Sequence, residues 1–243
     1  MKYQVLGTTM QCLSVDLEPG EKIYTESGAM AWMSSNIKMD TNFKGGLLKS
    51  FARAITGESL TFTFYEATGS TGNIGFVTAA PGKILPIMVQ PGTEYICQKG
   101  SFLCAQPSVE LSIHFNRKLG AGFFGGEGFI LQKLTGQGMA FVEIDGEVLE
   151  KQLAPGETIL VDTGHVAMFE ATVSMDIQMV KGVKNVIFGG EGLFLTTLRG
   201  PGRVWVQTLT LAGLAGRLRP LLGSSKSSSD GGMLNSVSDL FND

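Results

Sequence analysis

Three segments of the chain repeat one pattern, in which a Pro-Gly pair is followed by two short apolar stretches with a second glycine between them. They read LEPGEKIYTESGAMAWM from Leu17, VQPGTEYICQKGSFLCA from Val89 and LAPGETILVDTGHVAMF from Leu153. A Pro-Gly pair forms turns readily, because proline fixes φ and glycine accepts the left-handed conformation. Self-similarity at a steady interval indicates a repeated structural unit, and here it restricts the fold more than any other feature.

Two further signatures follow the Pro-Gly turns in the same order. The first is a Gly-Glu or Gly-Glu-Gly turn before an apolar stretch, at Gly57, Gly126 and Gly190. The second is a strand-like stretch, as in GFVTAAPGKILPI, MAFVEIDGEVLEKQL and VWVQTLTL. Three signatures in one order predict three diverged copies of a unit of roughly 65 residues. We place the copies at residues 17–88, 89–152 and 153–211.

The residues between the glycines have the pattern of β-strands. Leu60, Phe62 and Phe64 alternate with two threonines and a tyrosine, which is the period of two expected when one face of a strand is buried. Val, Ile, Thr and Phe favour strands, and 33 glycines in 243 residues suit a fold with many turns. The sequence therefore predicts a single all-β domain over residues 1–222.

The two ends of this domain are expected to meet. The stretch MQCLSVDLEPG near the start aligns with GKILPIMVQPG and GEVLEKQLAPG, each the second half of a predicted hairpin. Its own first half is missing, and the strand over 203–210 lacks a second half. We therefore expect strand 11–17 to pair with strand 203–210. That pairing would close the copies into a barrel or β-helix-like prism around a pseudo-threefold axis, which removes exposed sheet edges.

The pattern changes after the last copy. Leu211, Leu214, Leu218 and Leu221 recur at helical spacing, so a short helix is expected to lie on the barrel, weakened by its two glycines. Residues 223–243 begin with GSSKSSSDGG, a composition typical of a flexible linker. The final stretch MLNSVSDLFND has the pattern of a short amphipathic helix, but disorder or weak docking is favoured at this end of the chain.

Charge and cysteine content narrow the function classes. A net charge of −3 and a pI near 5.5 leave no global basic field, so a nucleic-acid partner is not expected. No apolar run suits a signal peptide near the start or a transmembrane helix, and we expect a cytoplasmic protein that can sit at the periphery of a membrane. Cys12, Cys97 and Cys104 fit no zinc motif and are expected to be free, buried thiols.

Catalytic patterns are weak in this sequence. The glycines of LGAGFFGGEG spell a dinucleotide fingerprint, but a strand-like stretch follows them where a helix is needed, so no cofactor is expected. His114 and His165 have no nucleophile elbow nearby and are interpreted as structural. Glu58, Glu127 and Glu191 follow glycine in all three copies, which admits a catalytic or metal-binding triad. The favoured alternative is that each carboxylate caps backbone N–H groups in its turn, with no catalytic residue and no metal ligand.

The segments before the Gly-Glu turns are both basic and apolar. They span residues 44–58, 115–127 and 180–191, and apolar side chains recur at helical spacing in the first. If the copies form a ring, the three segments gather at one end. Burial or self-association is the favoured interpretation, ahead of a protein partner and of an anionic lipid surface. The candidate interaction residues are Lys44, Leu48, Lys49, Phe51, Arg53, Arg117, Lys118, Phe123, Phe124, Lys181, Lys184 and Phe188.

The Pro-Gly-Glu turns and three longer stretches resemble a known family. The stretches are FARAITGESLTFTFYEATG (Phe51–Gly69), APGKILPI (Ala80–Ile87) and FGGEGLFLTTLRGPG (Phe188–Gly202), and the resemblance covers about residues 1–215. The chain is similar to the altered-inheritance-of-mitochondria proteins and their uncharacterised bacterial and archaeal relatives. The resemblance implies an all-β repeat barrel related in fold to the ring-forming tryptophan RNA-binding attenuator protein. It also implies, for mitochondrial members, an association with the inner membrane, and it implies no catalytic residue.

Three function classes follow from these observations. The first is a non-enzymatic scaffold or interaction protein that self-associates as a homo-oligomer, with an anionic membrane surface or a protein partner as its setting. The second is an RNA-binding protein of attenuator-like fold, which the acidic pI disfavours. The third is an enzyme or metal site that uses Glu58, Glu127 and Glu191. We expect the first.

Overall fold

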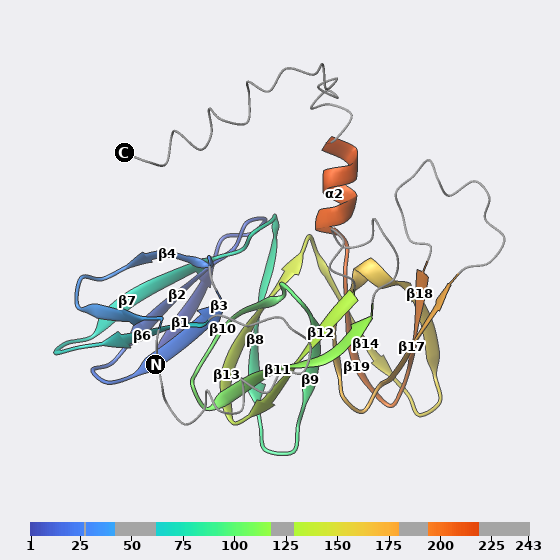
Figure 1. Cartoon of the computed structure of the whole chain (residues 1–243), viewed down its shortest axis with the longest axis horizontal. Helices are drawn as coiled ribbons and strands as arrows, with labels where there is room; N and C mark the ends of the chain where they lie inside the picture. The colour runs from blue at the N-terminus through green and yellow to red at the C-terminus, as the bar shows by residue number, and fades with distance from the viewer. Residues whose placement is uncertain (27, 42–61, 118–128, 180–193, 219–243) are drawn as a thin grey trace, which may run out of the picture.

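The computed structural model describes residues 1–26, 28–41, 62–117, 129–179 and 194–218, and the regular secondary structure of these residues is almost entirely β-strand (Figure 1). The nineteen strands of the described residues are followed by one α-helix. In chain order they are β1 (Lys2–Leu6), β2 (Cys12–Leu17), β3 (Lys22–Glu26), β4 (Met30–Met33), β5 (Ile37–Asp40), β6 (Phe62–Ala67), β7 (Gly72–Val77), β8 (Gly82–Val89), β9 (Tyr95–Gln98), β10 (Phe102–Ala105), β11 (Val109–Arg117), β12 (Phe129–Gly136), β13 (Gly138–Asp145), β14 (Val148–Leu153), β15 (Thr158–Asp162), β16 (Val166–Glu170), β17 (Ser174–Met179), β18 (Phe194–Arg199), β19 (Gly202–Gln207) and α2 (Leu211–Leu218), with a short 3₁₀ turn η2 (Thr163–His165) before β16.

The Pro-Gly pairs form turns at equivalent places, as the sequence predicts. Gly20, Gly92 and Gly156 follow the three prolines and have φ of 84°, 83° and 81°. Residues that carry a side chain rarely adopt this left-handed backbone conformation, whereas glycine does so without steric cost. Each turn connects two strands that belong to different sheets, so these glycines mark the points where the chain passes from one layer to the next.

The strands form four antiparallel sheets. The first sheet has the order β1-β2-β7-β4, the second β5-β6-β3-β10-β13-β8, the third β11-β12-β9-β16-β19-β14 and the fourth β15-β18-β17. Successive groups of six strands repeat the same pairings, and we call β2–β7, β8–β13 and β14–β19 the first, second and third units. The first and last strands of each unit pair with each other: β2 with β7, β8 with β13 and β14 with β19.

Each six-stranded sheet is shared between two units. The second sheet joins β5-β6-β3 of the first unit to β10-β13-β8 of the second, and the third sheet joins β11-β12-β9 to β16-β19-β14 in the same order. The first and fourth sheets are therefore half-sheets, and they lie at the two ends of the stack. The first consists of β4-β7-β2 with β1 added beside β2, and the fourth consists of β15-β18-β17. No unit contains a complete six-stranded sheet of its own.

Three hydrophobic cores lie between the four sheets. Leu13, Ile74 and Phe76 of the first sheet meet the second sheet in one core, whereas Tyr24 and Trp205 lie in the core between the second and third sheets. A third core lies between the third and fourth sheets. Strands of the shared sheets are buried at consecutive residues, as in β10 and β12, which means that both faces of these sheets are covered.

The predicted closure into a barrel or prism is wrong. Strand β2 (Cys12–Leu17) pairs with β1 and β7, and β19 (Gly202–Gln207) pairs with β14 and β16, so strands 11–17 and 203–210 do not pair. In Figure 1 the blue amino-terminal sheet and the orange strands β17 and β18 lie at opposite ends of the long axis. The physical reason is that each unit already supplies the partner of its own first strand. The pseudo-threefold axis stays a prediction.

The predicted helix after the last strand is present as α2. Thr210 Oγ1 accepts a hydrogen bond from Gly213 N at 3.0 Å in its first turn. None of its residues is buried, and Leu211 and Leu218 are exposed, so it does not lie on the sheets as expected (Figure 1). Leu221 and residues 223–243 fall outside the described residues. No helix within the described ranges is long and apolar enough to cross a membrane.

Candidate functional site

Most of the candidate residues predicted from the sequence lie outside the described residues, and their roles stay predictions. Arg117 is the exception, because it ends β11 and its backbone pairs with Phe129 of β12. The others are Lys44, Leu48, Lys49, Phe51, Arg53, Glu58, Lys118, Phe123, Phe124, Glu127, Lys181, Lys184, Phe188 and Glu191.

The histidines and cysteines do not form a site with one another. His165 is the last residue of the turn η2, with Nδ1 2.7 Å from the carbonyl oxygen of Gln207, and His114 is exposed on β11. Cys97 and Cys104 are fully buried and Cys12 is half-buried, all three as free thiols. In the part of the chain that the structure describes, no cluster of three or more His, Cys, Asp or Glu side chains is arranged to hold a metal ion.

The junctions between units are the most regular feature of the sheets. At the first junction β3 pairs antiparallel with β10, and Tyr24 lies opposite Ala105. At the second junction β9 pairs antiparallel with β16, and Ile96 lies opposite Phe169. Counted from the preceding turn glycines, Tyr24 and Ile96 hold one position of the unit, and Ala105 and Phe169 hold another. Both junctions therefore use the same register.

The paired side chains at both junctions are buried. Tyr24 and Ile96 are each 1% exposed, Ala105 is fully buried and Phe169 is 2% exposed. At the second junction Cys97 and its partner Met168 are buried too. Burial of such apolar side chains is the main favourable contribution to holding two sheet halves together.

Polar contacts add to the apolar ones at both junctions. Thr25 Oγ1 on β3 donates a hydrogen bond to the carbonyl oxygen of Leu103 on β10 at the first junction. At the second, Ala171 N donates to the carbonyl oxygen of Glu94 at 3.0 Å. Because Thr25 is buried, its bond also satisfies a hydroxyl that would otherwise be costly to desolvate.

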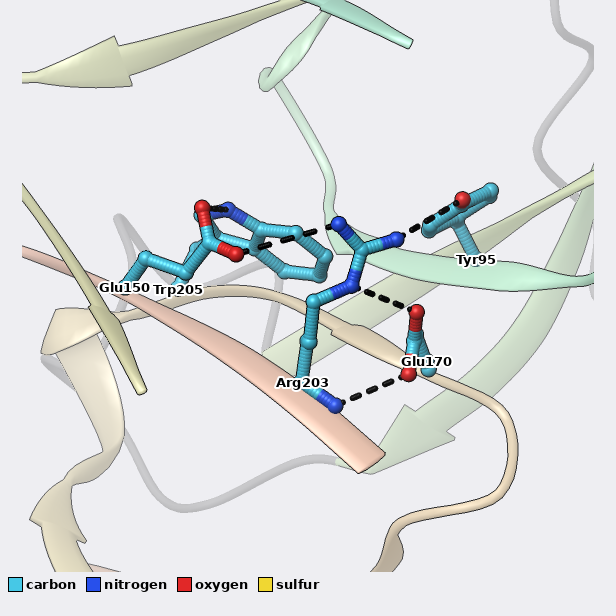
Figure 2. Close-up of polar contacts among 5 residues, drawn as sticks. All are labelled: Tyr95, Glu150, Glu170, Arg203 and Trp205. Carbon is cyan, nitrogen blue, oxygen red and sulfur yellow. Dashed lines mark hydrogen bonds and ion pairs between the residues drawn. The ribbon is translucent and has the colours of Figure 1, made fainter. Parts of the chain in front are cut away.

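A cluster of hydrogen bonds and ion pairs around Arg203 spans the second junction (Figure 2). Arg203 on β19 donates through Nε to Glu170 Oε1 at 2.7 Å and through Nη2 to the hydroxyl oxygen of Tyr95 on β9 at 3.3 Å. Its Nη1 lies 3.7 Å from Glu150 Oε1, and Trp205 Nε1 donates to Glu150 Oε2 at 3.1 Å. The guanidinium carbon lies 5.0 Å from the centre of the Trp205 ring. The cluster thus connects β9, β14, β16 and β19.

The electrostatics of the cluster favour a structural role. The hydrogen bond with Glu170 raises the pKa of the Arg203 guanidinium, so the side chain stays charged. Figure 2 shows that its nitrogen atoms are directed at Glu170, Glu150 and Tyr95, all side chains of the protein itself. A guanidinium with these partners is not positioned to receive a substrate anion. We interpret the cluster as a set of polar contacts that hold the second and third units together.

The outer strands of the two half-sheets have no counterpart of these junctions. Within the described ranges, β4 pairs on one side only, with β7, and β15 pairs on one side only, with β18. Leu160 on β15 holds the position of Tyr24 and Ile96, and it is 63% exposed. Each half-sheet therefore ends in a strand that resembles an internal junction strand but carries exposed apolar residues.

The edge strand β4 shows the same contrast. Met33 holds the position of Ala105 and Phe169 and is 37% exposed, and Trp32 holds the position of Met168 and is 40% exposed. Trp32 Nε1 donates a hydrogen bond to Asn73 Oδ1 at 2.9 Å, which fixes the indole on the surface of the first sheet. We call β4 with Trp32 and Met33, and β15 with Leu160, the two open edges.

Sequence reasoning identified the segments that contain the open edges but missed their role. Both lie inside the Pro-Gly signature, where MAWM and TILVD align with buried strands of the other copies. Apolar residues in such an alignment indicate burial. Only the order of strands in the sheets shows that β4 and β15 lack a neighbour among the described residues, and strand order depends on contacts distant in sequence.

Comparison with known proteins gives consistent matches. The sequence matches the family model described as Mitochondrial biogenesis AIM24 over residues 3–209. It is 28% identical over 221 residues to an uncharacterised protein of Streptococcus pyogenes serotype M6, an alignment that covers 88% of this chain and 87% of the streptococcal one. It is 25% identical over 175 residues to the altered inheritance of mitochondria protein 24 of Verticillium alfalfae, covering 70% of this chain and 44% of the fungal protein.

A solved structure has a similar fold. The crystal structure of a Streptococcus pyogenes protein superposes with a TM-score of 0.73 at 24% sequence identity, and the match covers 90% of this chain and 99% of that one. A likeness at this identity concerns the arrangement of strands and leaves the chemistry of the site to be argued from the residues of this chain.

Proposed function

The chain belongs to the mitochondrial biogenesis AIM24 family, and from that premise we propose that it is a non-enzymatic scaffold that self-associates through the open edges of its sheet stack. The observation that carries the proposal is the exposure of Leu160, Trp32 and Met33 at positions that are buried at both internal junctions. Exposed strand edges with apolar side chains are templates for pairing with another chain.

A non-enzymatic role is supported by the state of the reactive groups. Arg203 is held by partners within the protein, so it is a poor anion site. Burial raises the pKa of the Cys97 thiol to about 12 and raises that of Cys104 well above its ordinary value. A buried thiol with a raised pKa is a poor nucleophile, because the thiolate is the reactive form.

The test of self-association is the mass of the purified chain in solution. Light scattering coupled to size-exclusion chromatography should give a mass that rises with concentration above the 25.9 kDa of one chain. A mass of one chain at every concentration up to the millimolar range would contradict the proposal.

The setting of this assembly rests on the basic-apolar segments. We propose, as the sequence predicts, a cytoplasmic protein that can meet an anionic membrane surface. The double variant Lys49→Glu/Arg53→Glu should lose co-sedimentation with anionic liposomes while keeping its circular dichroism spectrum, because its two charges would be reversed. Equal co-sedimentation of the unmodified chain with anionic and neutral liposomes would remove the membrane from the proposal.

A further inference from the structure

We infer that the two open edges are complementary: β15 of one copy pairs with β4 of the next copy, head to tail. This rests on the proposed self-association and specifies which surfaces meet. The half-sheet β17-β18-β15 would join β4-β7-β2 of the next copy in the same order in which β5-β6-β3 joins β10-β13-β8 and β11-β12-β9 joins β16-β19-β14. The fold thus contains two examples of the contact within a single chain.

The two internal junctions fix the register of the contact. Both are antiparallel, and both place the same two positions of the unit opposite each other, as Tyr24–Ala105 and Ile96–Phe169. Transferred to the open edges, this register places Leu160 of one copy opposite Met33 of the next. The following pair, which corresponds to Cys97–Met168, is Val161 opposite Trp32.

Each exposed side chain would enter a core of the other copy. Tyr24 and Ile96 each lie in the core between their own sheet and the next sheet of the stack. By the same rule, Leu160 would enter the core between the first and second sheets of the neighbouring copy. Met168 lies in the core between its own sheet and the preceding sheet of the stack. By the same rule, Trp32 would reach the core between the third and fourth sheets of the other copy. Both side chains would pass from solvent to a buried site.

None of the described strands covers either open edge. The added strand β1 pairs with β2, on the side of the first sheet away from β4, so it does not cover the edge. Strand β15 has the pattern of alternating exposure expected for an edge, in contrast to β9, which is buried over three consecutive residues.

The polar contacts of the internal junctions are not reproduced at the open edges. The position of Thr25 is held by Val161, the position of Tyr95 by Ile159 and the position of Arg203 by Asn73. Val161 and Ile159 have no hydroxyl group, and the Asn73 side-chain amide donates to Ser14 and Asp16 within its own sheet. The contact between copies would therefore consist of main-chain hydrogen bonds and apolar burial, which suits a reversible association.

A head-to-tail contact has a diagnostic that a symmetric one lacks, because each copy offers two different patches. The variant Leu160→Asp disables the β15 edge and leaves β4 intact, whereas Met33→Asp does the reverse. Each variant alone should have the mass of one chain by light scattering. An equimolar mixture should form a 1:1 complex of two chains and nothing larger, because one good edge of each kind remains.

The control variant is Leu149→Asp, which places the same charge at a leucine that is 51% exposed on β14, away from both open edges. It should assemble like the unmodified chain. Circular dichroism and thermal melting of the three variants establish that each is folded. A Leu160→Asp or Met33→Asp chain that still dimerises alone would show a symmetric contact and overturn the inference.

The register is tested separately by disulfide formation in a Cys12→Ser background. A Leu160→Cys/Met33→Cys chain should form linked multimers on mild oxidation, because directly opposed residues on paired strands lie within disulfide reach. Pairing Leu160→Cys with Ala31→Cys, two residues out of register, should give little product. If the unmodified chain assembles but the mixture and the cross-link both fail, the inference is wrong and the proposed function stands; if the unmodified chain never assembles, the proposed function itself fails.

Discussion

Trp32 on β4, the third strand of the first unit, pairs with Gly75 on β7, the sixth strand. At this position the other two units carry a small or flexible side chain on the third strand and an aromatic ring on the sixth. The pairs are Cys104 with Phe141 and Met168 with Trp205. A Cβ atom added to Gly75 would lie 2.1 Å from Trp32 Cε2, so the indole occupies the space that a side chain of β7 would fill. The aromatic group is kept while the strand that supplies it changes.

This exchange predicts a rescue. Gly75→Trp alone should lower the free energy of unfolding by about 3 kcal/mol or more, because two rings would compete for one space. The double variant Trp32→Met/Gly75→Trp copies the third unit and should recover most of that loss. Urea denaturation of both measures it, and losses that simply add would show that the two sites are independent.

Glu143 on β13 makes the stability of the fold depend on pH. Its Oε2 accepts a hydrogen bond from Ala79 N at 2.9 Å, and burial raises the pKa of its carboxyl to about 7. Because the folded pKa lies above the ordinary 4.5, stability from this group is full below pH 4.5, falls as pH rises towards 7 and is then level.

The variant Glu143→Gln should therefore be more stable than the unmodified chain at pH 8, by about 1–3 kcal/mol, and the two should converge near pH 4. Thermal melts across this range are the measurement. Glu147→Gln, at an exposed carboxyl of the following turn that pairs with Lys83, is the control and should change the stability only slightly. A parallel profile for Glu143→Gln would contradict the assignment.

The three thiols should differ in reactivity because they differ in burial. Cys12 is half-buried, whereas Cys97 and Cys104 have no exposed surface. With a thiol reagent at neutral pH, Cys12 should react in the native protein and the other two only after addition of denaturant. Equal labelling of all three under native conditions, read by mass spectrometry, would show that the cores open readily.

At the level of elements, the Arg203 cluster should account for much of the strength of the second junction. Arg203→Met should lower the free energy of unfolding by about 1–3 kcal/mol, because Glu170 and Tyr95 would lose a charged partner across β9, β16 and β19. The exposed Arg199, on β18, supplies the matched control Arg199→Met, for which chemical denaturation should show little change. Equal losses in the two variants would mean that the cluster contributes only surface charge.

Turns and single strands were predictable from the sequence, whereas strand partners were not. The prolines before Gly20, Gly92 and Gly156 specify turns through local conformation, and the leucines of α2 specify a helix through their spacing. The partner of β2 is β7, which lies far along the chain, and nothing in the local pattern distinguishes it from β19. Similar strands in each unit offer similar edges, so an alignment of copies leaves the pairing undetermined.

The candidate site was less predictable than the fold for a related reason. The sequence predicts a site in the basic-apolar segments because their composition is unusual, and these segments lie mostly outside the described residues. Leu160 and Met33 look in sequence like their buried counterparts Ile96 and Phe169. They are exposed because, among the described residues, no further strand lies beside β15 or β4, and the sequence of a single copy does not show this.

At the level of the whole molecule, assembly and membrane contact should respond differently to salt. The open edges pair without ion pairs in the inferred contact, so the mass measured by light scattering should be nearly equal in 50 mM and 500 mM NaCl, whereas binding to anionic liposomes should weaken strongly at the higher concentration. Dissociation of the assembly by salt would point to the charged segments as its main contact and would argue against the open edges.

Because neighbouring units divide each central sheet between them, the fold sets no upper limit on how many units one gene encodes. A chain with two units, or with four, would still begin with a half like β4-β7-β2 and finish with a half like β15-β18-β17. Duplication or loss of a unit would then alter the size of the polypeptide while its two termini remained mutually compatible. In such a system covalent linkage and association are interchangeable ways to lengthen the same stack.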